Sequence, residues 1–371
     1  MNSDNKILIV ADSAWELLMS IHIKLSLYRN CFVTLIMTDR SQGMYEVYKK
    51  LKKLNVIDEV IFVEANQFPG FQKTRLLPNV ISSKLYDMIC EKRAASYLNK
   101  PSQYKYFITS EIDYFSRYMY LAVKKTAEPL FLGEGIFPFA GFVENIENNK
   151  LQRNARLLRD ANTILYYGPK LKELPFKRQI QIPSVNQNRD ELVSILNSIF
   201  GYIPHKKVYS NKIIFFEESY SNDGGSDNAL DFLKILVRKY GKEKIVVKRH
   251  PRDKTNRFAE MEIESIEPFH IPWELFTLNG DCKECVLLAA NSGSVYLSKL
   301  WDLCNEPVEC VMLNHLLDYE YVGGSCMDVY MQFLDEMYMN EKYMVPNTEE
   351  EMFGLIDQIF GKWRPAMKSQ A

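Results

Sequence analysis

The residues best suited to chemistry in this sequence lie between positions 212 and 253. An apolar run at 212–216 has the length of a buried strand and leads into an acidic, glycine-rich loop. A second apolar run at 245–247 leads directly into the polar segment KRHPRD at 248–253. A carboxylate on one loop and a histidine among cations on the next could bind an anion and move a proton together.

The elements around these loops indicate how they are positioned. Residues 229–239 carry apolar side chains on one helical face, and Gly241 ends the predicted helix. Residues 212–253 therefore predict a strand–loop–helix–strand unit, which is the building block of a parallel sheet. Open sheets of this kind bind ligands at the carboxyl ends of their strands, where both polar loops lie.

Apolar strands alternate with amphipathic helices along most of the chain, which predicts an α/β fold of doubly wound parallel sheets. The alternation is interrupted over 170–210, where prolines and a polar run at 184–190 flank one helix near 191–200. We predict two Rossmann-like domains, at 1–180 and 211–345, joined by a linker at 181–210 and followed by a helical segment at 346–371. The predicted strands are 6–10, 31–37, 59–63, 106–108, 130–132, 162–166, 212–216, 245–247, 285–289 and 308–313.

Composition excludes several classes of protein. The 371 residues carry a net charge of −1, so no global charge favours binding to nucleic acid. No apolar run approaches the ~20 residues of a membrane span, and the first residues lack the apolar core of a signal peptide. The seven cysteines are scattered, and the one C-x-x-C motif has no second pair at zinc spacing. We expect a cytoplasmic protein with reduced thiols, and a contact with the inner face of the cell membrane stays open.

A third polar cluster, Ser292-Gly293-Ser294, follows the predicted strand at 285–289 and opens a helix. Free N–H groups at a helix start and two hydroxyls suit a phosphate group. The same residues also suit a simple helix cap.

These clusters, in this order, resemble motifs of bacterial sialyltransferases. Residues 248–253 resemble the K-x-H-P-R-[DE] segment of that group, and FEESYSNDG at 216–224 resembles the acidic loop of the lipooligosaccharide enzymes of glycosyltransferase family 52 and of the capsule sialyltransferases. IPWE at 271–274 is similar to their I-P-x-E segment, and 292–294 stands where they carry Ser-Ser or Ser-Thr. In LGEGI at 132–136, a glycine replaces the first acid of their [DE]-[DE]-Gly motif. The resemblance covers residues 130–300.

The resemblance implies a GT-B fold, in which two Rossmann-like domains face each other across a cleft. It implies a metal-independent, inverting transferase that needs no cofactor and uses CMP-sialic acid as donor. The implied acceptor is a terminal galactose-type sugar of a bacterial lipooligosaccharide, capsule or exopolysaccharide. The acceptor could be lipid-linked, and the protein could form a homodimer. Three alternatives to this function remain: a transferase that uses another nucleotide sugar as donor, a non-catalytic scaffold in polysaccharide assembly, and a nucleotide-binding regulator.

The resemblance also implies roles for individual residues. His250 donates a proton or a hydrogen bond to the leaving phosphate. The base that accepts the acceptor's proton is Asp223 or, on the other domain, Glu134; we favour Asp223, and Asp227 stays open. Asp223 and Glu134 could each equally well be an ordinary turn residue at a strand end, with no catalytic role. The residues expected to bind the donor are Lys248, Pro251, Arg252, Glu274, Ser292, Gly293 and Ser294, of which Glu274 contacts the ribose or base of CMP. The other histidines, at 22, 205, 270 and 315, match no motif.

Overall fold

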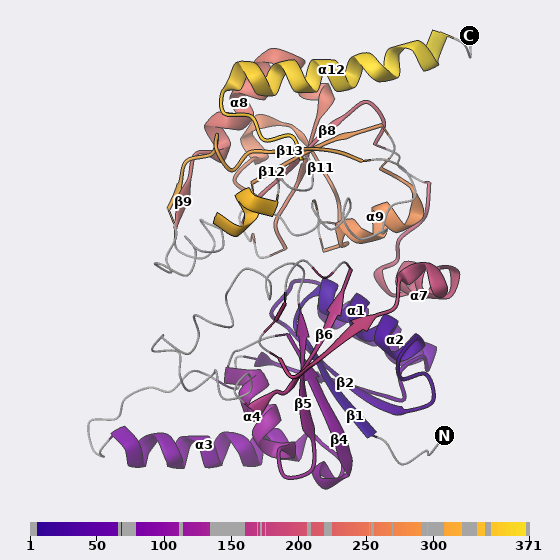
Figure 1. Ribbon diagram of the computed structural model, residues 1–371, viewed down its shortest axis with the longest axis vertical. Coiled ribbons are helices and arrows are strands. Elements are labelled where there is room, and N and C mark those ends of the chain that lie inside the picture. The colour runs from indigo at the N-terminus through magenta and orange to yellow at the C-terminus, as the bar shows by residue number, and fades with distance from the viewer. Residues whose placement is uncertain are drawn as a thin grey trace. The chain divides into compact units, whose positions relative to one another are not determined.

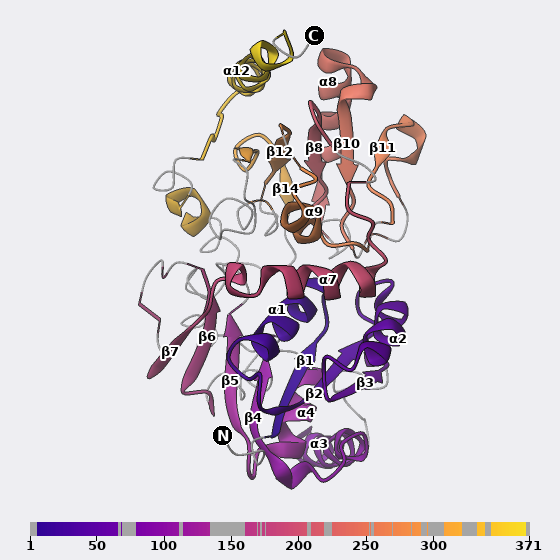
Figure 2. The same cartoon turned by 90° about the vertical axis from the view of Figure 1, so that its right-hand side faces the viewer.

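The structure, a computed structural model, divides into two compact units: unit 1, residues 1–200, and unit 2, residues 201–371. It describes residues 6–65, 68, 79–110, 114–133, 160–168, 170, 173–174, 176–205, 209–218, 225–251, 253, 256–268, 270–282, 284–290, 295, 308–320, 332–337 and 343–368. Figures 1 and 2 show both units as ribbons from two directions.

Unit 1 contains a seven-stranded parallel sheet in the order β3-β2-β1-β4-β5-β6-β7. Its interior strand β1, with the apolar sequence KILIVA, is buried from its second residue onward, as expected for a strand covered on both faces. The strands are β1 (Lys6–Ala11), β2 (Phe32–Thr38), β3 (Glu59–Val63), β4 (Tyr104–Thr109), β5 (Glu128–Gly133), β6 (Thr163–Tyr167) and β7 (Arg178–Ile182).

The helices of unit 1 cover its sheet. The first begins at a capping box, because Ser13 Oγ accepts the Glu16 N–H and the Glu16 side chain accepts N–H groups in return. It is buried along its length, and the last helix of the unit lies beside it (Figure 2). The helices are α1 (Ala14–Leu25), α2 (Met44–Leu54), α3 (Asn79–Ser96), the short 3₁₀ helix η2 (Pro101–Gln103), α4 (Tyr114–Val123), η4 (Val185–Gln187) and α7 (Arg189–Phe200).

Unit 2 contains a five-stranded parallel sheet in the order β11-β10-β8-β12-β13 and a short antiparallel pair, β14-β9. The strands are β8 (Ile213–Phe216), β9 (Ser226–Asp227), β10 (Ile245–Lys248), β11 (Glu264–Ser265), β12 (Val286–Ala289), β13 (Glu309–Met312) and β14 (Tyr319–Glu320). The helices are α8 (Ala229–Tyr240), η5 (Lys242–Lys244), η6 (Ala259–Met261), α9 (Trp273–Asn279) and α12 (Glu349–Lys368).

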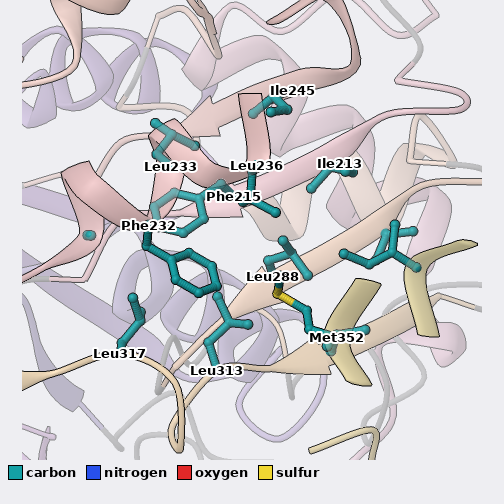
Figure 3. Packing of buried hydrophobic residues seen from close by; sticks show 14 of the residues in the cluster. Ile213, Phe215, Phe232, Leu233, Leu236, Ile245, Leu288, Leu313, Leu317 and Met352 are labelled. Carbon is teal, nitrogen blue, oxygen red and sulfur yellow. The ribbon is translucent and has the colours of Figure 1, made fainter. Parts of the chain in front are cut away.

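The core of unit 2 joins its strands to α8 and α12 (Figure 3). Phe215 from β8 packs near Phe232 from α8, with ring centroids 6.4 Å apart, and Leu288 from β12 belongs to the same cluster. Met352 of α12 is fully buried there, so the C-terminal helix is part of this core.

The predicted fold class is confirmed, since both units are parallel α/β sheets. The interruption predicted over 170–210 holds one strand that the sequence pattern did not reveal, β7, which is the edge strand of the unit 1 sheet. The helix expected near 191–200 is α7, which packs on α1 and α2. An edge strand such as RQIQI is only partly covered, so it lacks the continuous apolar run of a central strand.

Candidate functional site

The strand order of the unit 2 sheet by itself indicates where a ligand would bind. From β8 the chain moves outward through β10 to β11, and it then returns to β12 and β13 on the other side of β8. The order reverses between β8 and β12. Because ligands of open α/β sheets bind outside the carboxyl ends of strands at such a reversal, the loops after β8, β10 and β12 form the candidate site.

A hydrogen bond joins the two strand ends at this reversal. The backbone N–H of Ala290, directly after β12, donates to Oε1 of Glu218 at 2.8 Å. Glu218 is 4% exposed, and Ala290 is fully buried. This charge-assisted bond fixes the end of β12, immediately before the segment 291–294, against the end of β8.

Glu217 holds the backbone of the His250 loop. The His250 N–H donates to Glu217 Oε2 at 2.9 Å, and the Glu217 N–H donates to the Lys248 carbonyl at 3.0 Å. The Glu217 side chain is buried, and the His250 residue is partly exposed. The loop is therefore anchored through its backbone at the residue whose ring is the predicted catalytic group.

Arg257 completes this anchor. Its Nε donates to Glu217 Oε1 at 2.9 Å, and its Nη1 donates to Asp227 Oδ1 at 2.7 Å. Burial raises the pKa of Glu217, against the His250 N–H and the Arg257 charge, which favour the ionised form. The planar fork of an arginine suits this bridge, because one cation bonds two separate carboxylates. We call Glu217, Arg257 and Asp227 the clamp.

Lys248 is a buried cation at the end of β10. Burial lowers its pKa to about 8, against the opposing charges of Glu274 and Glu267. Glu274 stands in the first turn of α9, which is fixed near β8 because Trp273 packs edge-on against Phe216 with centroids 5.2 Å apart. The predicted donor residues Lys248 and Glu274 thus interact with each other.

The turn after His250 is closed by a second ion pair. The Asp253 N–H donates to the His250 carbonyl at 2.9 Å, and Arg249 Nε donates to Asp253 Oδ2 at 3.1 Å. Arg249 Nη1 also lies 3.5 Å from Glu267 Oε1. Pro251 lies inside this turn. The turn therefore presents the His250 side chain from a backbone that is bonded on both sides.

Several predicted residues are placed by these contacts, and others are not described. His250, Pro251, Lys248 and Glu274 belong to neighbouring segments at the carboxyl edge of the unit 2 sheet. The remaining predicted site residues, Glu134, Asp223, Arg252, Ser292, Gly293 and Ser294, lie outside the described residues, and their roles stay predictions.

The open alternative for the base, Asp227, has a structural position. Its carboxylate is 1% exposed, accepts the Ala229 N–H at 3.0 Å and is paired with Arg257. A general base must lie within hydrogen-bond reach of a substrate proton, whereas the Asp227 carboxylate is buried against Arg257 and the start of α8. The geometry therefore assigns Asp227 to the clamp and to the start of α8.

Three residues at this edge were not among the predicted site residues: Glu217, Glu218 and Arg257. The sequence does point to the two glutamates, because they directly follow a buried parallel strand, where functional side chains gather. Arg257 has no such signal, because it stands beyond the KRHPRD segment in an irregular stretch. Only the fold brings its guanidinium back to the end of β8.

The corresponding edge of unit 1 has a different composition. The order of its sheet reverses between β1 and β4, and Glu16 lies there with 1% exposure. Its Oε2 accepts the N–H groups of Asp12 and Ser13 at 2.6 and 2.8 Å, and Ser110 Oγ donates to its Oε1. Asp12 Oδ1 accepts the Thr38 hydroxyl at 2.6 Å, and burial raises the pKa of Asp12. The amides at this helix start are therefore occupied by the protein's own carboxylate.

No group of three His, Cys, Asp or Glu side chains could hold a metal ion within the described ranges. The described helices include none that is long and apolar enough to cross a membrane. The metal-independent mechanism stays a prediction.

Comparison with known proteins gives matches to solved structures alone. No protein-family model matches the chain, and no curated protein matches it. MurG of Acinetobacter baumannii is 12% identical, with a TM-score of 0.48 and coverage of 97% of this chain and 91% of that one. A UGT transferase of Siraitia grosvenorii in complex with UDP is 13% identical, with a TM-score of 0.49 and coverage of 97% and 92%. A putative UDP-N-acetylglucosamine 2-epimerase of Listeria monocytogenes is 10% identical, with a TM-score of 0.45 and coverage of 97% and 95%.

Proposed function

We propose that the protein is a glycosyltransferase of the GT-B type that transfers sialic acid from CMP-sialic acid to a terminal galactose-type sugar of a bacterial surface glycan. The observation that carries the proposal is the His250 loop. A histidine follows a buried lysine at the carboxyl end of a parallel strand, beside the reversal of the sheet. The order of the sequence motifs from 130 to 300 supports the choice of donor.

The chemistry of an inverting transfer explains why this loop has cations. The acceptor oxygen forms a bond to the anomeric carbon while the bond from that carbon to the phosphate oxygen of CMP breaks. The phosphate leaves with negative charge, which a nearby proton donor stabilises in the transition state. His250 supplies that proton or hydrogen bond, and Lys248 raises the positive potential around the leaving group.

The clamp contributes rigidity to this step. A catalytic group must stay within a few tenths of an ångström of its productive position. The bond from the His250 N–H to Glu217, held in turn by Arg257, keeps the histidine backbone in one place. The acceptor hydroxyl gives its proton to Asp223 or to Glu134, as the sequence motifs predict.

The test is incubation of the purified chain with CMP-sialic acid and a panel of galactosides, followed by mass spectrometry of the products. We expect a product heavier than a galactoside by one sialic acid residue, together with free CMP. Transfer from a different nucleotide sugar, with none from CMP-sialic acid, contradicts the proposed donor and leaves the transferase class in place.

A calorimetric titration with CMP separates the enzyme from the two non-catalytic alternatives. We expect saturable binding that is lost in a variant with a blocked site. No heat of binding at millimolar CMP, combined with no transfer from any nucleotide sugar, contradicts the enzyme and favours the scaffold. Binding of CMP without turnover of any donor favours the regulator.

A further inference from the structure

One helix of unit 1 exposes apolar side chains in a group. Leu85, Met88 and Ile89 of α3 are 44%, 48% and 54% exposed. Their spacing of three and four residues places them on one face of a helix with 3.6 residues per turn. Figure 1 shows α3 beside α4, with one end of α3 extending beyond the strands of unit 1. An apolar group of this kind on one helix differs from single exposed side chains, which are ordinary.

Cations occupy the same face. Lys84, Lys92 and Arg93 are exposed, and at 100° per residue they fall within the half of the helix that carries the three apolar side chains. We call these six residues, Lys84, Leu85, Met88, Ile89, Lys92 and Arg93, the α3 face.

Of the two acidic residues of α3, Asp87 lies on its other side, towards α4, and Glu91 lies just outside the arc of the α3 face. Asp87 is half-buried and is paired with Arg117 of α4, whose Nη2 lies 2.5 Å from Asp87 Oδ2. Tyr86 packs edge-on against Tyr118 of α4, and Cys90 and Ala94 are buried. These contacts fix the rotation of α3 about its axis, so the α3 face is the side that does not pack on α4. Three cations lie on it, and the half-buried Glu91 lies at its edge, beside Lys84.

We propose that the α3 face binds the surface of a membrane that contains anionic lipids. A helix that lies in the membrane surface needs bulky apolar residues on its buried side and lysines or arginines that reach the headgroups. The α3 face has both in one arc, and its net positive charge matches an anionic lipid surface. The charge decides the occupant, because a second protein would have to supply a complementary acidic surface with the same spacing. The inference rests on α3 alone and does not depend on the proposed function.

The first test measures the charge contribution by co-sedimentation with vesicles. The full chain is mixed with vesicles of 30% phosphatidylglycerol and 70% phosphatidylcholine, and with vesicles of phosphatidylcholine alone. We expect binding to the anionic vesicles that weakens as salt is added. In Lys84→Gln/Lys92→Gln/Arg93→Gln, the partition coefficient falls by about 100-fold, since each cation near an anionic surface contributes about fivefold.

A charge-matched control uses the neighbouring helix α2. Lys50, Lys52 and Lys53 are exposed on it, and replacing all three with glutamine removes the same charge from the same unit. We expect this variant to bind within about threefold of wild type. An equal loss in both triple variants overturns the proposal, because binding would then follow total charge and not the α3 face.

The second test measures the apolar contribution. Met88→Gln/Ile89→Gln lowers the partition coefficient by about tenfold, since two partly exposed apolar side chains no longer enter the lipid surface. Leu54→Gln/Ile203→Gln removes exposed apolar side chains elsewhere and is expected to leave binding unchanged. Circular dichroism verifies that each variant is folded. Absence of binding by the full chain, or equal binding to phosphatidylcholine vesicles, overturns the proposal.

Discussion

The two parallel sheets present opposite chemistry at their carboxyl edges. In unit 1, Glu16 takes the backbone amides of Asp12 and Ser13, so the start of α1 is already neutralised by an internal carboxylate. In unit 2, the acids Glu217 and Glu218 are also internal, but they stand beside a buried lysine and a partly exposed histidine. The same topology therefore yields one edge whose helix start is occupied by an internal carboxylate and one edge that carries a buried lysine and a partly exposed histidine.

This difference supports a division of labour between the units. A nucleotide donor carries phosphate and needs cations, whereas an acceptor sugar carries hydroxyls that carboxylates and hydroxyls can bind. We infer that the donor binds at the edge of unit 2, and the variants below test this contrast.

The largest effect is expected for His250→Ala. Loss of the group that protonates the leaving phosphate lowers kcat by about 100-fold or more. We expect the fold to survive, because His250 is a partly exposed residue and its backbone bond to Glu217 does not need the side chain. Steady-state kinetics with CMP-sialic acid and circular dichroism measure the two properties. If the activity stays close to that of wild type, His250 is not part of the mechanism. The main chemical difference between the carboxyl edges of the two sheets then has no functional meaning.

The clamp is tested by Arg257→Met. The substitution leaves the buried carboxylates of Glu217 and Asp227 without their shared cation, and we expect a loss of about 2–3 kcal/mol in the free energy of unfolding. Because the His250 backbone is then less firmly held, kcat falls about tenfold while the KM for donor changes less. Urea unfolding and steady-state kinetics measure both quantities.

The control for this loss is Lys242→Met, which breaks the exposed pair with Glu262. Because water screens an exposed pair, both the free energy of unfolding and the activity of this variant should stay close to those of wild type. A conservative variant, Arg257→Lys, should recover part of the stability, because an ammonium keeps the charge but lacks the planar fork. If Arg257→Met retains the kcat of wild type, the clamp is structural only.

The pH dependence of donor binding tests Lys248. The pKa of Lys248 is lowered to about 8, so its ammonium is charged below that pH and neutral above it. The KM for donor should therefore rise several-fold from pH 7.5 to 9. In Lys248→Met, the KM should not show this rise with pH. Exposed Lys239, replaced by methionine, serves as control.

Stability should respond to Lys248 in the opposite direction. Between about pH 8 and 10.5 the unfolded chain binds more protons at Lys248 than the folded one, so the free energy of unfolding rises with pH in this window. If the KM of Lys248→Met still rises with pH as in wild type, a group other than Lys248 causes the rise.

The smallest effect concerns unit 1, at His22. This ring is fully buried, and its Nε2–H donates to the Pro183 carbonyl at 2.6 Å. Burial lowers the pKa of His22 below 6.5, so the unfolded state binds more protons at low pH and stability is lost as pH falls below 6.5. We therefore expect the free energy of unfolding to be lower at pH 5 than at pH 7.

The measurement is urea unfolding at both pH values for wild type and His22→Gln. The variant should show a smaller difference between the two pH values. Exposed His315, replaced by glutamine, should leave the difference as in wild type. If the His22 variant does not differ from the control, the acid sensitivity of unit 1 arises at another group.

The elements that the sequence predicted well are those with strong local patterns. The apolar runs 59–63 and 245–247 match β3 and β10 to within one residue, and Gly241 ends α8 as expected. The edge strand β7 was not predicted, because its side chains are only partly covered and follow no continuous apolar run. His250 was recognised from residues adjacent to it in the sequence.

The sequence by itself determined the parallel α/β fold, since the alternation of apolar strands and helices is a local property. It also determined that a histidine among cations follows a buried strand. Only the tertiary structure decided that Arg257 reaches back to Glu217 and Asp227, and that Asp227 is held as part of the clamp. The reason is physical: hydrogen bonds across 30 and 40 residues depend on strand order, which brings the ends of β8, β10 and β12 to one edge of the sheet.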